Sequence, residues 1–104
     1  MAAFTFRTTF VVYATPDEVF EAMTDPGIIA AWGGGLSVIE PKPGGHFEMF
    51  DGWVKGEVTH FVFGKELGFT WKPTEWEKKT KPSSVHMRFI AHAAGTDVVL
   101  IHTG

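Results

Sequence analysis

The sequence has 104 residues, of which 44% are hydrophobic and 20% charged, and it contains no cysteine. This composition is typical of one globular domain, and it excludes a disulfide scaffold and a zinc site built on thiolates. The formal net charge of −3 argues against a nucleic-acid partner, and no apolar run approaches the roughly 20 residues that a transmembrane helix needs.

The first predicted element is a β-strand over residues 4–12, with the sequence FTFRTTFVV. Apolar and polar residues alternate in it, which is typical of a strand with one buried face. Phe4, Phe6, Phe10 and Val12 fall on the same side, so we expect that side to face the core.

Two short helices are predicted directly after this strand. Thr15 and Glu18 have the spacing of a capping box, and Pro16 occupies the first helical position. Asp25 and Pro26 repeat this start signal for a second helix, which the glycines at 33–35 end. The apolar faces of the two helices are Val19, Phe20 and Met23, and Ile28, Ile29 and Trp32.

From Leu36 onward the pattern predicts antiparallel strands joined by turns. We expect strands over residues 36–40, 46–50, 53–63, 67–71, 83–93 and 98–102. The Asp51-Gly52 pair predicts a tight hairpin turn, and a second hairpin turn is expected over residues 94–97. The mixed charges of the segment 74–81 indicate a solvated loop. The fold class is therefore α+β: a curved antiparallel seven-stranded sheet with two short helices after the first strand.

The last predicted strand raises the question of what covers it. Val98, Val99, Leu100 and Ile101 are all apolar, and a curved sheet needs its concave face filled. Two short helices fill only one end of that face. We therefore expect a covering element that the 104 residues do not contain.

The ordered segments of the chain resemble a known family. They are ATPDEVFEAMTDPGIIAAWGG, GGHFEMFDGWVKGEV, FTWKPTEW, SSV and GTDVVLIHTG, and they span essentially the whole chain. Together they are similar to the Hsp90 ATPase activator homologue branch of the START-like (SRPBCC, helix-grip) superfamily. The resemblance implies a single domain over residues 1–104 with a β-α-α-β6-α fold, whose long final helix closes a cavity over the sheet.

Relative to that family, the sequence is predicted to be truncated before the final helix. Three explanations remain open: a fragment of a longer protein, a short version that forms a homodimer, or a covering element from another chain. We favour a homodimer that buries the open sheet, because several hundred Å² of exposed apolar surface is unusual for a monomer.

Aromatic and other apolar side chains are the candidate ligand-binding residues. In the arrangement of the family they would approach the cavity: Trp32, Phe47, Met49, Phe69, Trp71, Met87 and Leu100. Met87 and Leu100 face inward if Val85 and Val98 do. Ordinary core packing is the alternative, and pockets for small molecules are also largely apolar. Trp53 and Trp76 are expected at a rim or interface.

No metal site is predicted from the histidines. His86 and His92 lie six residues apart on one strand, which is roughly 20 Å and too far to share an ion. His46 and Glu48 share a face, but two ligands without a third do not make a site. The Trp32-Gly33-Gly34-Gly35 segment lacks the spacing of a phosphate-binding loop, and no cofactor is expected.

No catalytic residue is predicted either. Ser83 and Ser84 precede His86 on a strand, and such neighbours do not form a triad. An enzymatic function would depend on general acid or base chemistry by Glu48, Asp51 or Glu57. The resemblance leaves this open, because some START-like relatives are cyclases or dehydratases.

The sequence is compatible with three functions. The first is a module that binds a hydrophobic small molecule, and the second is a protein-interaction module that docks on an Hsp90-type chaperone. The third is a cavity enzyme of cyclase or hydrolase type. The first ten residues lack the pattern of a signal peptide, so we expect a cytoplasmic protein with no membrane partner.

Overall fold

The computed structural model describes residues 5–104, so Phe4 lies outside the described residues. The elements are β1 (Thr5–Val12), α1 (Pro16–Thr24), α2 (Pro26–Ala31), β2 (Val38–Ile39), β3 (His46–Met49), β4 (Val54–Val62), β5 (Glu66–Pro73), β6 (Ser83–His92) and β7 (Gly95–Thr103). The strands form one sheet in the order β1-β7-β6-β5-β4-β3-β2. Every neighbouring pair is antiparallel, which confirms the predicted α+β fold.

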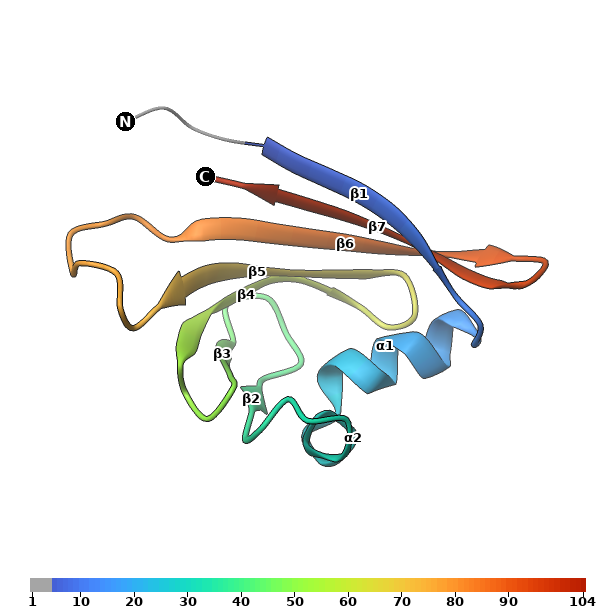
Figure 1. Ribbon diagram of the computed structural model, residues 1–104, viewed down its shortest axis with the longest axis horizontal. Helices are drawn as coiled ribbons and strands as arrows, with labels where there is room; N and C mark the ends of the chain where they lie inside the picture. Colours follow the sequence, from blue (N-terminus) through green and yellow to red (C-terminus); the bar gives the residue numbers. More distant parts are fainter. Residues whose placement is uncertain (1–4) are drawn as a thin grey trace.

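Both helices lie on the same side of the curved sheet, as Figure 1 shows. We call that side the concave face and the opposite side the outer face. Directly opposite residues of antiparallel strands point to the same face, so the pairs Phe10 with Val98 and Met87 with Leu100 define the concave face. The prediction that Met87 and Leu100 share a face is confirmed.

The helices begin as the sequence predicts. The Thr15 Oγ1 atom accepts a hydrogen bond from the backbone N–H of Glu18 at 3.2 Å, and Glu18 Oε1 accepts from the backbone N–H of Thr15 at 3.1 Å. The backbone bond lowers the pKa of the Glu18 carboxyl. Asp25 Oδ1 accepts from the N–H groups of Gly27 and Ile28 at 2.9 and 3.1 Å. Both caps are therefore confirmed.

The core lies between α1 and the middle of the sheet. Phe20 of α1 has no exposed surface, and its ring contacts those of Phe61, Phe63 and Phe89 in edge-to-face arrangements. Ile29 of α2 is buried beside it. The apolar stripe read from the two helices therefore supplies the core, although Ile28 and Trp32 remain partly exposed.

Two expectations about the sheet were wrong. The side of β1 expected to face the core is open at Phe6, which is 56% exposed, and at Phe10, which is 37% exposed, and only Val12 of that side packs against the core among the described residues. Helix α1 packs against β6 and part of β7 and reaches Phe61 of β4, so the Phe6 end of β1 stays bare. The last hairpin turns at residues 93 and 94, rather than over 94–97, so that β7 already begins at Gly95.

The turn between β3 and β4 takes an unusual backbone. Phe50, Asp51 and Gly52 all have positive φ angles, of 55°, 59° and 82°. Aspartate and glycine tolerate this left-handed region, which explains the pair. Asp51 Oδ1 also accepts the backbone N–H of Leu36 at 2.8 Å. Asp51 is thus engaged in holding the turn against the segment that enters β2.

Candidate functional site

Six of the seven predicted ligand-binding residues meet on the concave face. Strands β3, β5, β6 and β7 bring them there through the register of the sheet. Four of them are buried and two are partly buried; they are Phe47, Met49, Phe69 and Met87, followed by Trp71 and Leu100. Burial in the core is what both ordinary packing and a pocket wall require.

An aromatic row runs across this face toward β7. The Phe47 and Phe69 rings are stacked with their centroids 4.2 Å apart, and the Trp71 ring lies 6.3 Å from that of Phe69. The row continues to the His102 imidazole, whose centroid lies 6.3 Å from that of Trp71. It therefore leads from the buried core to the uncovered part of the sheet.

The uncovered part of the concave face is largely apolar. We call it the open face and define it by Phe6, Phe10, Trp71, Leu100 and His102. The register places His102 opposite Phe6 and Leu100 opposite Thr8, so β1 and β7 form one continuous surface here. Phe6 and Phe10 are the exposed aromatic residues of this surface. The open face can thus accept an apolar molecule or an apolar protein surface.

Trp32 lies apart from the other six residues. It caps the end of α2, half of its surface is exposed, and its indole Nε1–H donates to the carbonyl oxygen of Ala22 at 2.7 Å. This hydrogen bond joins α2 to α1. The geometry accounts for Trp32 as a link between the helices.

Ser83 and His102 form a polar pair on this otherwise apolar wall. The Ser83 hydroxyl donates to the Trp71 carbonyl at 3.1 Å, and its oxygen lies 2.6 Å from His102 Nε2. Burial lowers the pKa of the His102 imidazole, which favours its neutral form. Ser83 is almost fully buried and already donates its proton to a carbonyl, so the pair has the geometry of a structural contact rather than of a nucleophile with its base.

This pair was missed in the sequence, although a signal for it exists. The two-residue turn at 93–94 sets His92 opposite Gly95, and the same register sets Val85 opposite His102. Ser83 then points to the same face as Val85, within diagonal reach of His102. The expected turn over residues 94–97 would have given a different register.

The three candidate acids lie away from the concave face. Glu48 is on the outer face, where it hydrogen-bonds His46, and this bond lowers the pKa of the Glu48 carboxyl. Glu57 pairs with His46 in the register and shares that face. Asp51 holds the β3–β4 turn. No acid of the enzyme hypothesis is therefore placed beside the aromatic row.

A pair of histidines on the outer face was also missed. The rings of His60 and His86 are 4.8 Å apart, because Gly68 stands between them on β5 and has no side chain to separate them. Within residues 5–104 no three His, Asp or Glu side chains come together as metal ligands. The pair gives the outer face two titratable groups rather than a metal site.

We expect the fold to lose stability in mild acid because of His86 and His102. Burial lowers the pKa of both, and for His86 the positive charge of His60 lowers it further. As the pH falls through the ordinary histidine value of about 6.5, the unfolded chain takes up protons before the folded chain does. The thermal midpoint should therefore decrease between pH 7.5 and pH 5.5, measured by circular dichroism.

The variant His86→Gln isolates one of these two contributions. It should show a smaller decrease of the midpoint over the same pH range than the native chain. The exposed His92, whose Nδ1 accepts the N–H of Ala94, offers His92→Gln as the matched control. An unchanged pH dependence in His86→Gln would contradict the assignment.

Comparison with known proteins adds to this geometry. A sequence profile of the family described as activator of Hsp90 ATPase homolog 1-like protein matches residues 13–104. The activator of 90 kDa heat shock protein ATPase homolog 1 of Mus musculus is 31% identical over 72 residues, which are 69% of this chain and 21% of that protein. The protein of the same name from Homo sapiens gives the same values. This chain thus spans about a fifth of the length of these relatives.

Solved structures show the same architecture. An Hsp90 activator from Plasmodium falciparum matches with a TM-score of 0.81 and 28% identity, over 94% of this chain and 71% of that one. Protein MLL2253 from Mesorhizobium loti matches with a TM-score of 0.80 and 21% identity, over 96% and 76% of the two chains. The second likeness concerns the fold alone. In the described part of this chain, no helix has the length and hydropathy to cross a membrane.

Proposed function

Because this chain belongs to the family of activator of Hsp90 ATPase homolog 1-like proteins, we propose that its residues 1–104 form one START-like domain that binds an apolar small molecule on the concave face. The observation that carries the proposal is the open face. Its exposed Phe6 and Phe10 continue the aromatic row that begins in the core.

The chemistry of the open face fits an apolar ligand with few polar groups. Sites for small molecules are lined mainly by hydrophobic and aromatic side chains, and a small number of polar groups fix the orientation. Trp71 and Leu100 provide the apolar wall, and the Ser83–His102 pair provides the polar group at its edge. A neutral His102 suits an uncharged ligand, because it brings no charge to the wall.

A homodimer is the second way to cover the open face. Apolar side chains on a sheet edge favour association, and a two-fold interface would place the open face of one copy, with Phe6 and Phe10, against the open face of its partner. We include this assembly in the proposal because the same exposed surface supports both occupants. The small molecule and the second copy then compete for one face.

Docking on an Hsp90-type chaperone is the alternative function. The names of the mouse and human relatives favour it, since both describe activators of the Hsp90 ATPase. This chain corresponds to only 21% of each of those proteins, so their activity does not pass to it as a whole. The cytoplasmic location expected from the sequence would agree with such a partner and stays a prediction.

A binding assay with a neutral apolar probe tests the proposed function. We expect N-phenyl-1-naphthylamine to bind the native chain and to bind Leu100→Gln about tenfold more weakly, since burying a leucine side chain is worth about 1.5–3 kcal/mol. Val99→Gln is the matched control, because Val99 is the next residue of β7 and points to the outer face. Equal loss in both variants, or no binding to the native chain, would refute the ligand site.

Native mass spectrometry separates the remaining occupants. A mass increase of the single chain identifies a retained small molecule, whereas twice the chain mass without an adduct identifies the dimer. A complex that forms only after purified Hsp90 is added supports the chaperone alternative. Apolar binding to the open face predicts that Leu100→Gln weakens each of these species.

A further inference from the structure

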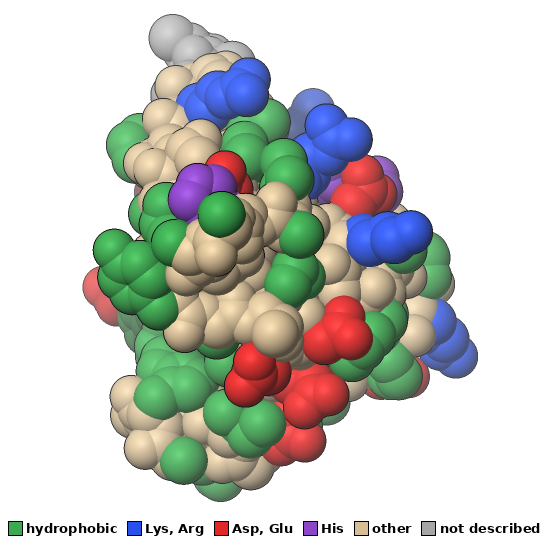
Figure 2. Space-filling model, turned by 90° about the vertical axis from the view of Figure 1, so that its right-hand side faces the viewer, with side chains coloured by type: hydrophobic (Ala, Val, Ile, Leu, Met, Phe, Trp, Pro, Cys, Tyr) green, Lys and Arg blue, Asp and Glu red, His purple; other side chains and the backbone are tan. Residues whose placement is uncertain are grey.

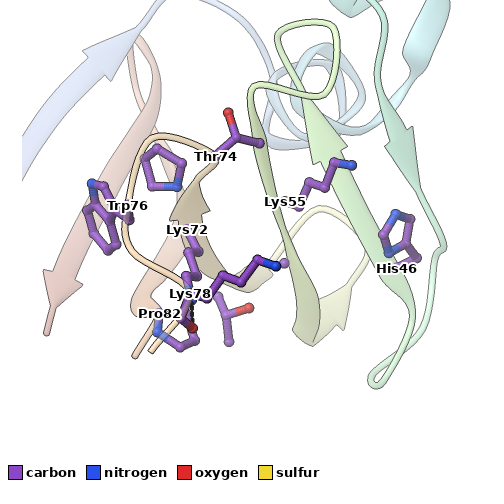
Figure 3. A pocket seen from close by; sticks show the side chains of 10 residues that line it. His46, Lys55, Lys72, Thr74, Trp76, Lys78 and Pro82 are labelled. Atoms are coloured by element: carbon purple, nitrogen blue, oxygen red, sulfur yellow. Dashed lines mark hydrogen bonds between the residues drawn. The ribbon is translucent and has the colours of Figure 1, made fainter. Parts of the chain in front are cut away.

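A pocket lies on the outer face of the sheet, on the opposite side from the aromatic row. It is a pocket of about 460 Å³, which we call the basic pocket and define by His46, Lys55, Lys72, Thr74, Trp76 and Lys78. Figure 3 shows Trp76 on one side of it, His46 on the other, and the three lysines between them. Its volume is in the range of sites for small molecules.

The sheet register and one folded-back loop build the basic pocket. Lys55 of β4 lies directly opposite Lys72 of β5, on the outer face. The loop after β5 then returns over the strand, so that the Lys72 ammonium donates to the carbonyl oxygen of Lys78 at 2.7 Å. Like charges directly opposite each other destabilise a sheet. The fold therefore keeps Lys55 and Lys72 side by side in spite of their repulsion, and the loop adds Lys78 to the lining of the same pocket.

Among the described residues, no aspartate or glutamate lines the basic pocket. Within residues 5–104, the ion pairs shorter than 4 Å are His46 with Glu48 and Arg88 with Glu66, and neither involves a lysine. Glu48 lies opposite Lys55 in the register; its carboxylate hydrogen-bonds His46, and after that bond the positive charge of Lys55 also lowers the pKa of the Glu48 carboxyl. The basic pocket thus concentrates positive charge in a chain of net charge −3.

Another group of acidic side chains lies away from the basic pocket (Figure 2). Figure 2 shows a group of acidic side chains low on the molecule, at the level of the helices in Figure 1. Asp17 and Glu18 in the first turn of α1 belong to the helix side. An approaching anion is therefore repelled on the helix side and attracted to the basic pocket.

The apolar part of the basic pocket is flat. Trp76 is held by the turn in which its backbone N–H donates to the Pro73 carbonyl at 3.0 Å, and Pro73 and Pro82 complete that wall. An indole next to ammonium groups offers a stacking surface for a planar ring and a hydrogen-bonding site for the anion attached to it. The Thr74 hydroxyl, on the same loop, adds a further donor.

We propose that the basic pocket binds a small molecule that carries a phosphate group on a planar ring system. Lys55, Lys72 and Lys78 bind the phosphate, and Trp76 stacks on the ring. A phosphate monoester carries close to two negative charges at neutral pH, so its charge complements a cluster of three cations better than the single charge of a carboxylate does. This site is independent of the apolar ligand proposed for the concave face.

The test uses adenosine 5′-monophosphate as the probe, in titrations of the full chain followed by the Trp76 indole N–H resonance and by calorimetry. Lys55→Gln and Lys78→Gln should each weaken binding about fivefold, because an exposed charge pair is worth up to about 1 kcal/mol. Lys55→Arg should retain the affinity. Lys65→Gln is the control, since Lys65 lies in the turn between β4 and β5 at the other end of these strands.

Adenosine, inorganic phosphate and the variant Trp76→Ala test the contributions of the ring and of the phosphate separately. Adenosine should bind more weakly than the monophosphate, and added sodium chloride should weaken the binding of the monophosphate. Trp76→Ala should reduce the affinity for the monophosphate and leave that for inorganic phosphate unchanged. Equal affinity for adenosine, or full affinity in both lysine-to-glutamine variants, overturns the proposal. Equal affinity for inorganic phosphate overturns the part that assigns the ring to Trp76.

Discussion

Phe20→Ala is expected to lower the free energy of unfolding by about 3–5 kcal/mol, which is a large part of the stability of a domain of this size. Phe20 is fully buried, and its ring lies 5.1, 5.2 and 5.4 Å from those of Phe61, Phe63 and Phe89. Removing the ring leaves a cavity between α1, strands β4 and β6, and the turn that contains Phe63. Urea denaturation followed by circular dichroism measures the change.

Phe63→Ala provides the matched control for this experiment. Phe63 contacts the same ring, but it is 52% exposed, so its removal opens no closed cavity. The loss should therefore be about 1 kcal/mol, as is usual for a partly exposed apolar residue. Similar losses in the two variants would show that Phe20 is not the centre of the core.

Gly56→Ala should destabilise the fold by about 3 kcal/mol, which is at the upper end for overpacking substitutions. A β-carbon at this position would overlap the Thr70 carbonyl oxygen and lie 2.7 Å from Thr70 Oγ1. The same hydroxyl accepts the backbone N–H of Glu57 at 2.8 Å. Relief of the overlap would thus separate β4 from β5 in the middle of the sheet.

Gly27→Ala is the corresponding control, measured by the same thermal and urea denaturation. Gly27 lies in α2, where its β-carbon would meet only the Asp25 side-chain oxygen at 3.2 Å. Alanine is favoured over glycine in helices by about 1 kcal/mol, so this variant should be neutral or slightly more stable. If Gly56→Ala were as stable as Gly27→Ala, the close contact between Gly56 of β4 and Thr70 of β5 would be contradicted.

The sequence predicted those features that depend on local chemistry. The Thr15 and Asp25 caps rest on residues within three positions of each helix start, and both form the expected hydrogen bonds. The two-residue period of a strand likewise predicted that Met87 shares the face of Val85 and Leu100 that of Val98, as in the structure. Such signals are local, and no tertiary contact was needed to read them.

Features that depend on the tertiary arrangement were not predicted. Phe6 alternates in β1 as a core residue does, yet its burial depends on an element packed against the sheet, which periodicity does not report. The basic pocket joins Lys55 to Lys72 by register and to Lys78 by a folded-back loop. The segment 74–81 is mostly exposed, as its mixed charges predict for a solvated loop, but its path back over β5 has no local signal.

The two proposed sites differ in how they would respond to solution conditions. Binding to the open face depends on apolar burial and should change little with salt. Binding in the basic pocket depends on exposed charges and should weaken as the ionic strength rises. Phosphate or sulfate buffers would therefore compete for the basic pocket while they leave the concave face unoccupied.

The position of β1 in the sheet also determines the order in which the chain can fold. Thr5 lies opposite Thr103, so β1 pairs with the strand of this sheet that the ribosome makes after the other six. The hairpins from β3 to β6 join segments close in sequence and can form earlier, whereas closing the longest loop of the fold must wait. During synthesis β1 therefore remains a single strand, with Phe6 and Phe10 accessible to chaperones, until β7 has left the ribosome.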